Sequence, residues 1–191
     1  MTRFVALLRG VNVGGHNKLP MADLRTALTA DGLDSVRTYI QSGNIVLDSA
    51  TYEVEVLAAR VRSVIARGFG LDIPVIALSA ADLQALADAN PYPDEPDPRR
   101  VHAIVLPHLP GSDALAAVAA RQDAVAAKGS RDSVTVIGRV AYLHTPDGFG
   151  TSELAKALAS GRSNPLADGT ARNWATVTAL LALCDADVTG P

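Results

Sequence analysis

The feature that most constrains the fold is an internal repeat. The segments SVRTYIQSGNIVL at 35–47 and SVTVIGRVAYLHT at 133–145 each hold two runs rich in β-branched or aromatic residues on either side of a turn signal. Each follows an apolar run, at 3–9 and 100–107, and a segment with apolar residues at helical spacing. A strand, a helix and a hairpin in this order begin a ferredoxin-like unit. The chain is therefore predicted to contain two such units in tandem.

A proline-rich segment separates the two copies. NPYPDEPDPRR, at 90–100, contains four prolines, and proline neither continues a helix nor fits a central strand. We expect an N-terminal ferredoxin-like repeat at 1–90, a proline-rich linker at 91–99, and a C-terminal β-α-β-β-α repeat with a terminal helix at 100–191.

The second copy is expected to be imperfect. Its second helix, at 152–160, is followed by no run typical of a strand, and a helical pattern over 171–184 takes the place of the last strand. The expected fold class is thus α+β, with two ferredoxin-like β-α-β-β-α repeats, antiparallel sheets with helices on one face, and a C-terminal helix.

A glycine-rich loop, RGVNVGGHNK at 9–18, directly follows the first predicted strand. Its first and last glycines have the spacing of a phosphate-binding GxxxxG motif, but His16-Asn17 stand where that motif requires Lys-Ser/Thr. The N–H groups of a glycine loop before a helix still approach an anion closely, and Arg9 and Lys18 add positive charge. The alternative is a plain turn that needs positive φ at Gly14 and Gly15.

Two further loops carry polar groups. QSGN at 41–44 offers amide donors and acceptors, or is simply a hairpin turn. HTPDGFG at 144–150 places His144 and Asp147 in one loop as a candidate acid–base pair, or is a Pro-Asp-Gly turn with a partly exposed histidine. Its Phe149 is expected to fill the core.

A fourth loop precedes the last helix. In TARNWATV at 170–177, Thr170 or Asn173 is suited to cap the helix. Arg172 then lies at a helix N-terminus, where its charge opposes the dipole, so a bound anion or a salt bridge would relieve the conflict. The candidate binding residues of the four loops are Arg9, Asn12, Gly14, Gly15, Asn17, Lys18, Gln41, Ser42, Asn44, His144, Asp147, Arg172 and Asn173.

These loops resemble the signature segments of a known family. ALLRGVNVGGHNKL, RTYIQSGNIVL, YLHTPDGFGTSEL and TARNWATVTAL are similar to segments of the DUF1697 family, bacterial proteins of uncharacterised function. The resemblance implies a mixed α/β fold with ferredoxin-like repeats and no established activity or cofactor. His16 and Glu153 stand at positions where the family often has lysine. Both departures lower the positive charge and leave binding through backbone donors intact.

The charge and composition of the chain limit the classes of function that are expected. The formal net charge is −3, so no broad basic field favours nucleic acid. No apolar run is long enough to cross a membrane, and no Cys/His spacing indicates a metal site. The one cysteine, Cys184, is compatible with a reducing cytoplasm.

We therefore expect a cytoplasmic protein that binds a small polar or anionic ligand, such as a nucleotide or a phosphorylated metabolite. The four loops are then expected to meet at a common polar cleft. Three alternatives stay open: an enzyme that uses His144 as acid or base, an RNA-binding module, and a protein-interaction module. The sequence indicates no cofactor and leaves the oligomeric state open.

Overall fold

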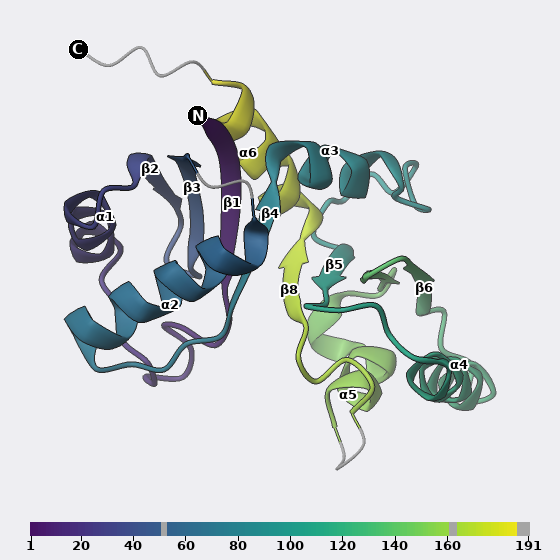
Figure 1. Ribbon diagram of the computed structural model, residues 1–191. Helices are drawn as coiled ribbons and strands as arrows, with labels where there is room; N and C mark the ends of the chain where they lie inside the picture. Colours follow the sequence, from purple (N-terminus) through teal and green to yellow (C-terminus); the bar gives the residue numbers. More distant parts are fainter. Residues whose placement is uncertain (51–52, 161–163, 187–191) are drawn as a thin grey trace. The chain divides into compact units, whose positions relative to one another are not determined.

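The computed structural model describes residues 1–50, 53–160 and 164–186. The chain divides into two units, Met1–Ala85 with Thr178–Pro191, and Leu86–Val177 (Figure 1). The division falls inside a helix, and the proline-rich segment 91–99 belongs to the second unit. Each unit is built on a four-stranded antiparallel sheet.

The first unit has the strand order β2-β3-β1-β4, and the helices α1 and α2 lie on one face of the sheet (Figure 1). Side chains alternate across a strand, so every second residue of β1 enters the core beneath these helices, as Phe4, Ala6 and Leu8 do. The elements are β1 (Thr2–Leu8), α1 (Met21–Ala30), β2 (Asp34–Tyr39), β3 (Asn44–Ser49), α2 (Val54–Phe69), β4 (Val75–Ser79) and α3 (Ala80–Asp88).

The second unit repeats this plan with the strand order β6-β7-β5-β8. Its core is formed by Ala141 and Leu143 of the sheet with residues of α4 and α5 such as Val118 and Leu154. The predicted α+β class, with two repeats built on antiparallel sheets and a C-terminal helix, is confirmed. The elements are β5 (Val101–Val105), α4 (Ser112–Ala126), β6 (Ser133–Ile137), β7 (Val140–His144), the 3₁₀ turn η1 (Phe149–Thr151), α5 (Glu153–Ala159), β8 (Thr170–Asn173) and α6 (Trp174–Asp185).

The last strand of the second copy, predicted to be missing, is present. β8 pairs with β5, with Ala171 opposite Ile104. It was missed because it is four residues long and runs directly into α6. Asn173 ends the strand and also caps the helix, since its Oδ1 accepts the Thr176 N–H at 2.9 Å. The second copy is therefore complete, and its terminal helix follows a strand instead of replacing it.

The two repeats align one residue away from the register that the sequence suggests. Leu8 donates its N–H to Gly43 O and Leu106 donates its N–H to Arg139 O, both at 2.8 Å and both at the end of a central strand or just past it. Leu8 thus corresponds to Leu106, whereas superposing the first residues of the two apolar runs, Arg3 and Arg100, would match Leu8 with Val105. A shift of one residue moves every side chain to the other face of a sheet, so the register decides which residues of the second unit face its helices.

Two arginines of the first unit hold the end of α6. Arg3 donates to Cys184 O at 2.5 Å and Arg37 donates to Leu183 O at 2.6 Å. Cations near a helix C-terminus satisfy its free carbonyls and oppose the negative end of its dipole. Arg3 also pairs with Asp48, with Nε at 3.0 Å from Oδ1. These contacts fasten the segment Thr178–Asp185 to the first unit.

Gly43 should tolerate no side chain. It has a φ of +76°, and a Cβ there would lie 2.6 Å from Leu8 Cβ and 2.7 Å from Val11 Cγ2. Gly43→Ala should cost about 2–4 kcal/mol of unfolding free energy, because overpacking adds to the left-handed strain. Gly138→Ala is the control: its φ is +58° and nothing lies within 4 Å, so only about 1 kcal/mol should be lost. Urea denaturation measures both, and equal losses would contradict the packing argument.

Candidate functional site

The glycine-rich loop of the first unit forms a small hairpin. Gly14 and Gly15 have φ values of +58° and +79°, and His16 donates its N–H to Val13 O at 3.0 Å. Two central residues with positive φ are typical of a type I′ turn. The helix α1 starts only at Met21, so the glycine N–H groups do not adjoin a helix N-terminus. The expected combination of glycine loop and helix dipole is not formed.

Asn12 and Asn17 brace this loop from inside. Asn12 Nδ2 donates to Leu19 O at 2.9 Å and to Gln41 O at 2.7 Å, while its Oδ1 accepts the Leu19 N–H at 2.8 Å. Asn17 Nδ2 donates to Gly10 O at 2.9 Å. Both predicted binding residues therefore use their side-chain amides to hold the loop, and Asn12 also ties it to the β2–β3 turn.

The β2–β3 turn is held in the same way. Asn44 is fully buried, and its Nδ2 donates to Tyr39 O at 3.1 Å and to Ser42 Oγ at 3.0 Å. Gln41 is exposed. The structure thus brings two of the predicted loops together. We call residues 9–19 and 40–43 the double loop.

Left-handed backbone conformations gather in the double loop. Ile40 has a φ of +48°, a rare conformation for a β-branched residue that costs about 1–2 kcal/mol. Observed strain of this kind occurs most often at functional sites. Positive φ values in the double loop occur at Gly10, Asn12, Gly14, Gly15, Asn17, Ile40 and Gly43.

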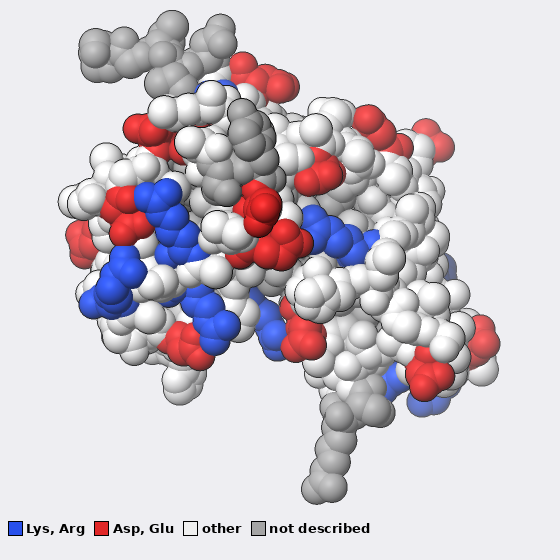
Figure 2. Space-filling model, viewed as in Figure 1, with Lys and Arg blue, Asp and Glu red and all other residues white. Residues whose placement is uncertain are grey.

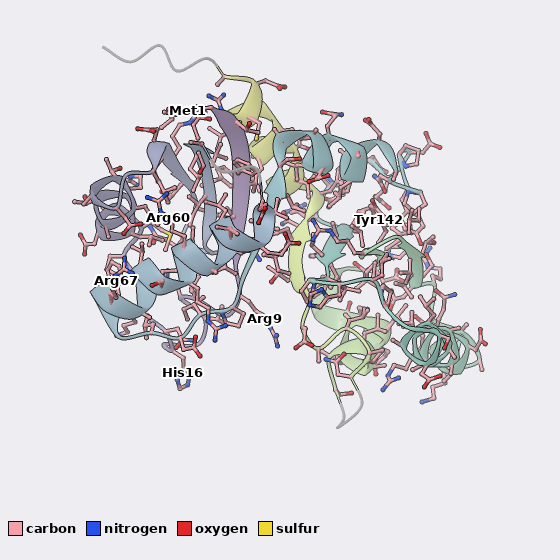
Figure 3. All side chains as sticks on the ribbon, in the orientation of Figure 1. Met1, Arg9, His16, Arg60, Arg67 and Tyr142 are labelled. Carbon is pink, nitrogen blue, oxygen red and sulfur yellow. The ribbon has the colours of Figure 1, made fainter. Side chains whose placement is uncertain are left out.

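The double loop presents a mixed surface to solvent. Val13 is 64% and Ile40 is 51% exposed, and His16 and Lys18 are exposed beside them. Arg9 is half-buried and donates its N–H to Pro74 O at 3.0 Å. Figure 3 shows Arg9 and His16 at the same end of the first unit. Backbone donors, cations and apolar side chains are therefore all available in the double loop.

The predicted acid–base pair of the second unit does not form. Asp147 pairs instead with Arg131, whose Nε donates to Oδ2 at 3.1 Å and whose guanidinium holds the pKa of Asp147 below its usual value. His144 ends β7, and its Nε2 lies 2.6 Å from Glu95 Oε2. This hydrogen bond is the main reason that the pKa of Glu95 is lowered. Glu95 was missed because it lies far along the chain in the proline-rich segment, where its only signal was its charge.

Tyr92 completes this group of side chains. Its ring stacks on the His144 imidazole with centroids 4.8 Å apart. Its hydroxyl oxygen lies 3.1 Å from both Thr135 Oγ1 and Ser133 Oγ. The proline-rich segment is therefore packed against β6 and β7. We call Tyr92, Glu95 and His144 the imidazole cluster.

Arg172 lies on β8, opposite Ala103 of β5. The repeat places it where the first unit has the buried Leu78. Burial lowers the pKa of Arg172 to about 10, and its Nη1 donates to Ala171 O at 2.8 Å. Asn173 caps α6, one of the two expected alternatives for that helix.

Phe149 does not fill the core. It is 43% exposed and stacks on the His102 ring with centroids 4.1 Å apart. Burial lowers the pKa of His102 to about 4. His102 Nδ1 is buried and, among the described residues, has no hydrogen-bond partner. This histidine is therefore neutral near pH 7.

The predicted residues divide between the units. Those from Arg9 to Asn44 belong to the first unit, and His144, Asp147, Arg172 and Asn173 belong to the second. A common cleft for all four loops stays a prediction. In the described ranges no group of three or more His, Cys, Asp or Glu side chains is placed to hold a metal ion. None of the helices described has the length and apolar character needed to cross a membrane.

Comparisons with known proteins identify the family and a similar fold. Residues 1–142 match the family described as "Protein of unknown function (DUF1697)", which confirms the family resemblance; of the four quoted segments, the match contains those at 6–19 and 37–47. The fold is similar to that of the conserved bacterial protein SP0830 from Streptococcus pneumoniae, with a TM-score of 0.70 and 23% identity over 96% of this chain and 99% of that chain. No curated protein matches the sequence.

The bracing role of Asn12 predicts a large effect of a small change. Asn12→Asp removes both donated hydrogen bonds. It also places a carboxylate oxygen next to the carbonyl oxygens of Leu19 and Gln41, which it repels. The unfolding free energy should fall by about 2–3 kcal/mol, and amide exchange over 10–19 should accelerate. Asn17→Asp, which removes a single donated bond, should have a smaller effect. Equal effects would show that the link to the β2–β3 turn contributes little.

His102 predicts a pH dependence of stability. Its pKa is about 4 in the folded protein, against 6.5 for the free side chain, so the unfolded chain binds the proton first as the pH falls. The neutral His102 of the folded protein therefore contributes to the unfolding free energy. This contribution is fully present above pH 6.5 and falls by about 3 kcal/mol as the pH is lowered from about 6.5 to 4. His102→Leu should remove this part of the pH dependence in urea denaturation at pH 7, 5.5 and 4.5. Parallel curves for the two proteins would contradict the assignment.

Proposed function

Because the chain belongs to the DUF1697 family of proteins of unknown function, we propose its function from its own geometry: the double loop binds a small anionic ligand. A nucleotide or a phosphorylated metabolite has the required chemistry. The observation that carries the proposal is a strained, internally braced loop that leaves the backbone donors of Gly14 and Gly15 and the side chain of Lys18 exposed to solvent.

The turn supplies the backbone donors. Among the described residues, neither Gly14 nor Gly15 donates its N–H group to a protein acceptor, and both residues are exposed. Successive N–H groups without a side chain above them can approach an anion closely. This contribution does not depend on a lysine at position 16, so it is unaffected by the family departure at His16.

Two cations flank the base of the hairpin. The hydrogen bond from Asn17 Nδ2 to Gly10 O closes the loop, and Arg9 and Lys18 directly adjoin its two ends. Arginine and lysine are the usual phosphate-binding side chains. A bound phosphate group would therefore meet positive charge on both strands of the loop.

The hydrogen bonds that hold the strained double loop in one conformation would favour ligand binding. A flexible loop loses conformational entropy when it closes on a ligand, whereas a pre-organised loop has lost it already on folding. The side-chain amides of Asn12, Asn17 and Asn44 are all bonded to backbone carbonyls. In this proposal they act as supports, and Arg9, Lys18 and the glycine N–H groups contact the ligand.

The charge distribution suits a small ligand. On the face shown in Figure 2, Lys and Arg side chains are interspersed with Asp and Glu and form no continuous basic field. Nucleic acids are bound through extended arrays of phosphate contacts, which this face does not supply. A cytoplasmic location, with which the single Cys184 is compatible, would provide nucleotides and phosphorylated metabolites.

Thermal-shift assays against inorganic phosphate, nucleotides and phosphorylated sugars test the proposal. A ligand at a hundred times its Kd should stabilise the protein by about 2.7 kcal/mol. Arg9→Ala and Lys18→Ala should each weaken a hit about tenfold or more, as expected for a charge-assisted hydrogen bond.

The matched control is Arg25→Ala. Arg25 belongs to the same unit and donates to Thr38 Oγ1 at 2.6 Å. Neither residue is part of the double loop, so the loss of Arg25 should leave affinity unchanged. The proposal is wrong if no phosphate-bearing compound shifts the melting temperature, or if all three variants bind the hits equally well.

A further inference from the structure

The imidazole cluster of the second unit has the hydrogen bonding of an acid–base centre. Glu95 Oε2 lies 2.6 Å from one imidazole nitrogen, Nε2. Glu95 is 8% exposed and His144 is 20% exposed at their side chains. A buried carboxylate bonded to one nitrogen of a histidine fixes the ring and its tautomer, so that the other nitrogen carries the lone pair.

The second nitrogen, Nδ1, is open. No described residue bonds to it, and it is not among the buried polar atoms that lack a partner, so solvent reaches it. Tyr92 covers a face of the ring by stacking and leaves this edge accessible. A general base must come within hydrogen-bond reach of the proton that it abstracts, and a nitrogen without a protein partner is available for this.

The repeat shows that the position does not require a histidine. The register aligns His144, opposite Val101, with Asp48, opposite Arg3. In the first unit these two positions form an ion pair. The second unit lacks that pair, carries an imidazole there, and recruits Glu95 from the proline-rich segment instead. A simple ion pair between neighbouring strands was thus available and is not the arrangement used.

A cation adjoins the cluster. Arg100 Nη1 lies 3.9 Å from Glu95 Oε1, and the Arg100 side chain is 44% exposed. Its Nε lies 3.8 Å from Asp97 Oδ2, and Asp97 itself is bonded to Arg99 at 2.9 Å. Positive charge beside a base favours reactions in which an oxygen atom becomes negative, as a carbonyl oxygen does when water attacks an ester.

From these contacts we propose that the second unit hydrolyses small carboxylic esters, with His144 as general base and Glu95 as its positioning residue. His144 Nδ1 takes a proton from water while the water oxygen bonds to the carbonyl carbon and the carbonyl electron pair moves to oxygen. The bond from this carbon to the leaving oxygen then breaks, and the imidazolium ion returns its proton to that oxygen. The products are a carboxylic acid and an alcohol, and His144 is regenerated.

Hydrolysis of p-nitrophenyl acetate by the full chain tests the inference. His144→Ala should lower the rate about 100-fold, the size of a general-base contribution. Glu95→Gln should lower kcat by a smaller factor and leave KM near its wild-type value, because the amide still contacts the ring but no longer selects its tautomer. That split between kcat and KM separates positioning from a merely structural role.

The chain provides its own control in His108, which is exposed. His108→Ala should hydrolyse the ester at the wild-type rate. His144→Gln keeps an N–H donor for Glu95 without a basic nitrogen, so it should be inactive but folded, as circular dichroism would show. The inference is overturned if His144→Gln retains the wild-type rate, or if the wild-type protein is no faster than free imidazole at equal concentration. Neither result depends on a ligand of the double loop, so this test and that of the proposed function fail independently.

Discussion

The alternation of side chains along β1 and β5 is the constraint on which the rest of this structure depends. In each unit this strand is paired on both edges, and alternate residues such as Leu8 of β1 and Ile104 of β5 pack into or against the core beneath two helices. Burial of this face stabilises the unit by about 25 cal/mol for each Å² of apolar surface removed from water. The strand ends and the connecting loops are then free to carry polar chemistry.

The two repeats use that freedom differently. In the first unit the ends of the strands carry the double loop, where amide side chains such as Asn12 and Asn44 hold a strained backbone in place. In the second unit the equivalent loop is short, and the proline-rich segment instead brings Glu95 onto His144. Duplication thus supplied one scaffold twice, and each copy surrounds it with different polar groups.

Much of this could be predicted from residues alone. Strong local signals were reliable: the segments predicted as hairpins, 35–47 and 133–145, correspond to the antiparallel pairs β2–β3 and β6–β7, and the first apolar run, at 3–9, lies in and beside β1. The strand β8 was not predicted because four residues have too little periodicity to be separated from the helix that follows. The pairing of His144 with Glu95 was not predicted because no local sequence pattern indicates a contact between residues 49 positions apart.

The sequence by itself determined most of the elements, their order and their duplication, because backbone propensity, apolar spacing and turn residues act over a few neighbouring positions. The family could be recognised for the same reason, since its signature lies in short contiguous segments. Only the tertiary structure decided the roles of the polar residues: Asn12, Asn17 and Asn44 became supports, Asp147 paired with Arg131, and His144 gained a carboxylate. A polar side chain bonds to whichever group the folded chain brings within about 3 Å, and that depends on packing between elements far apart in the sequence.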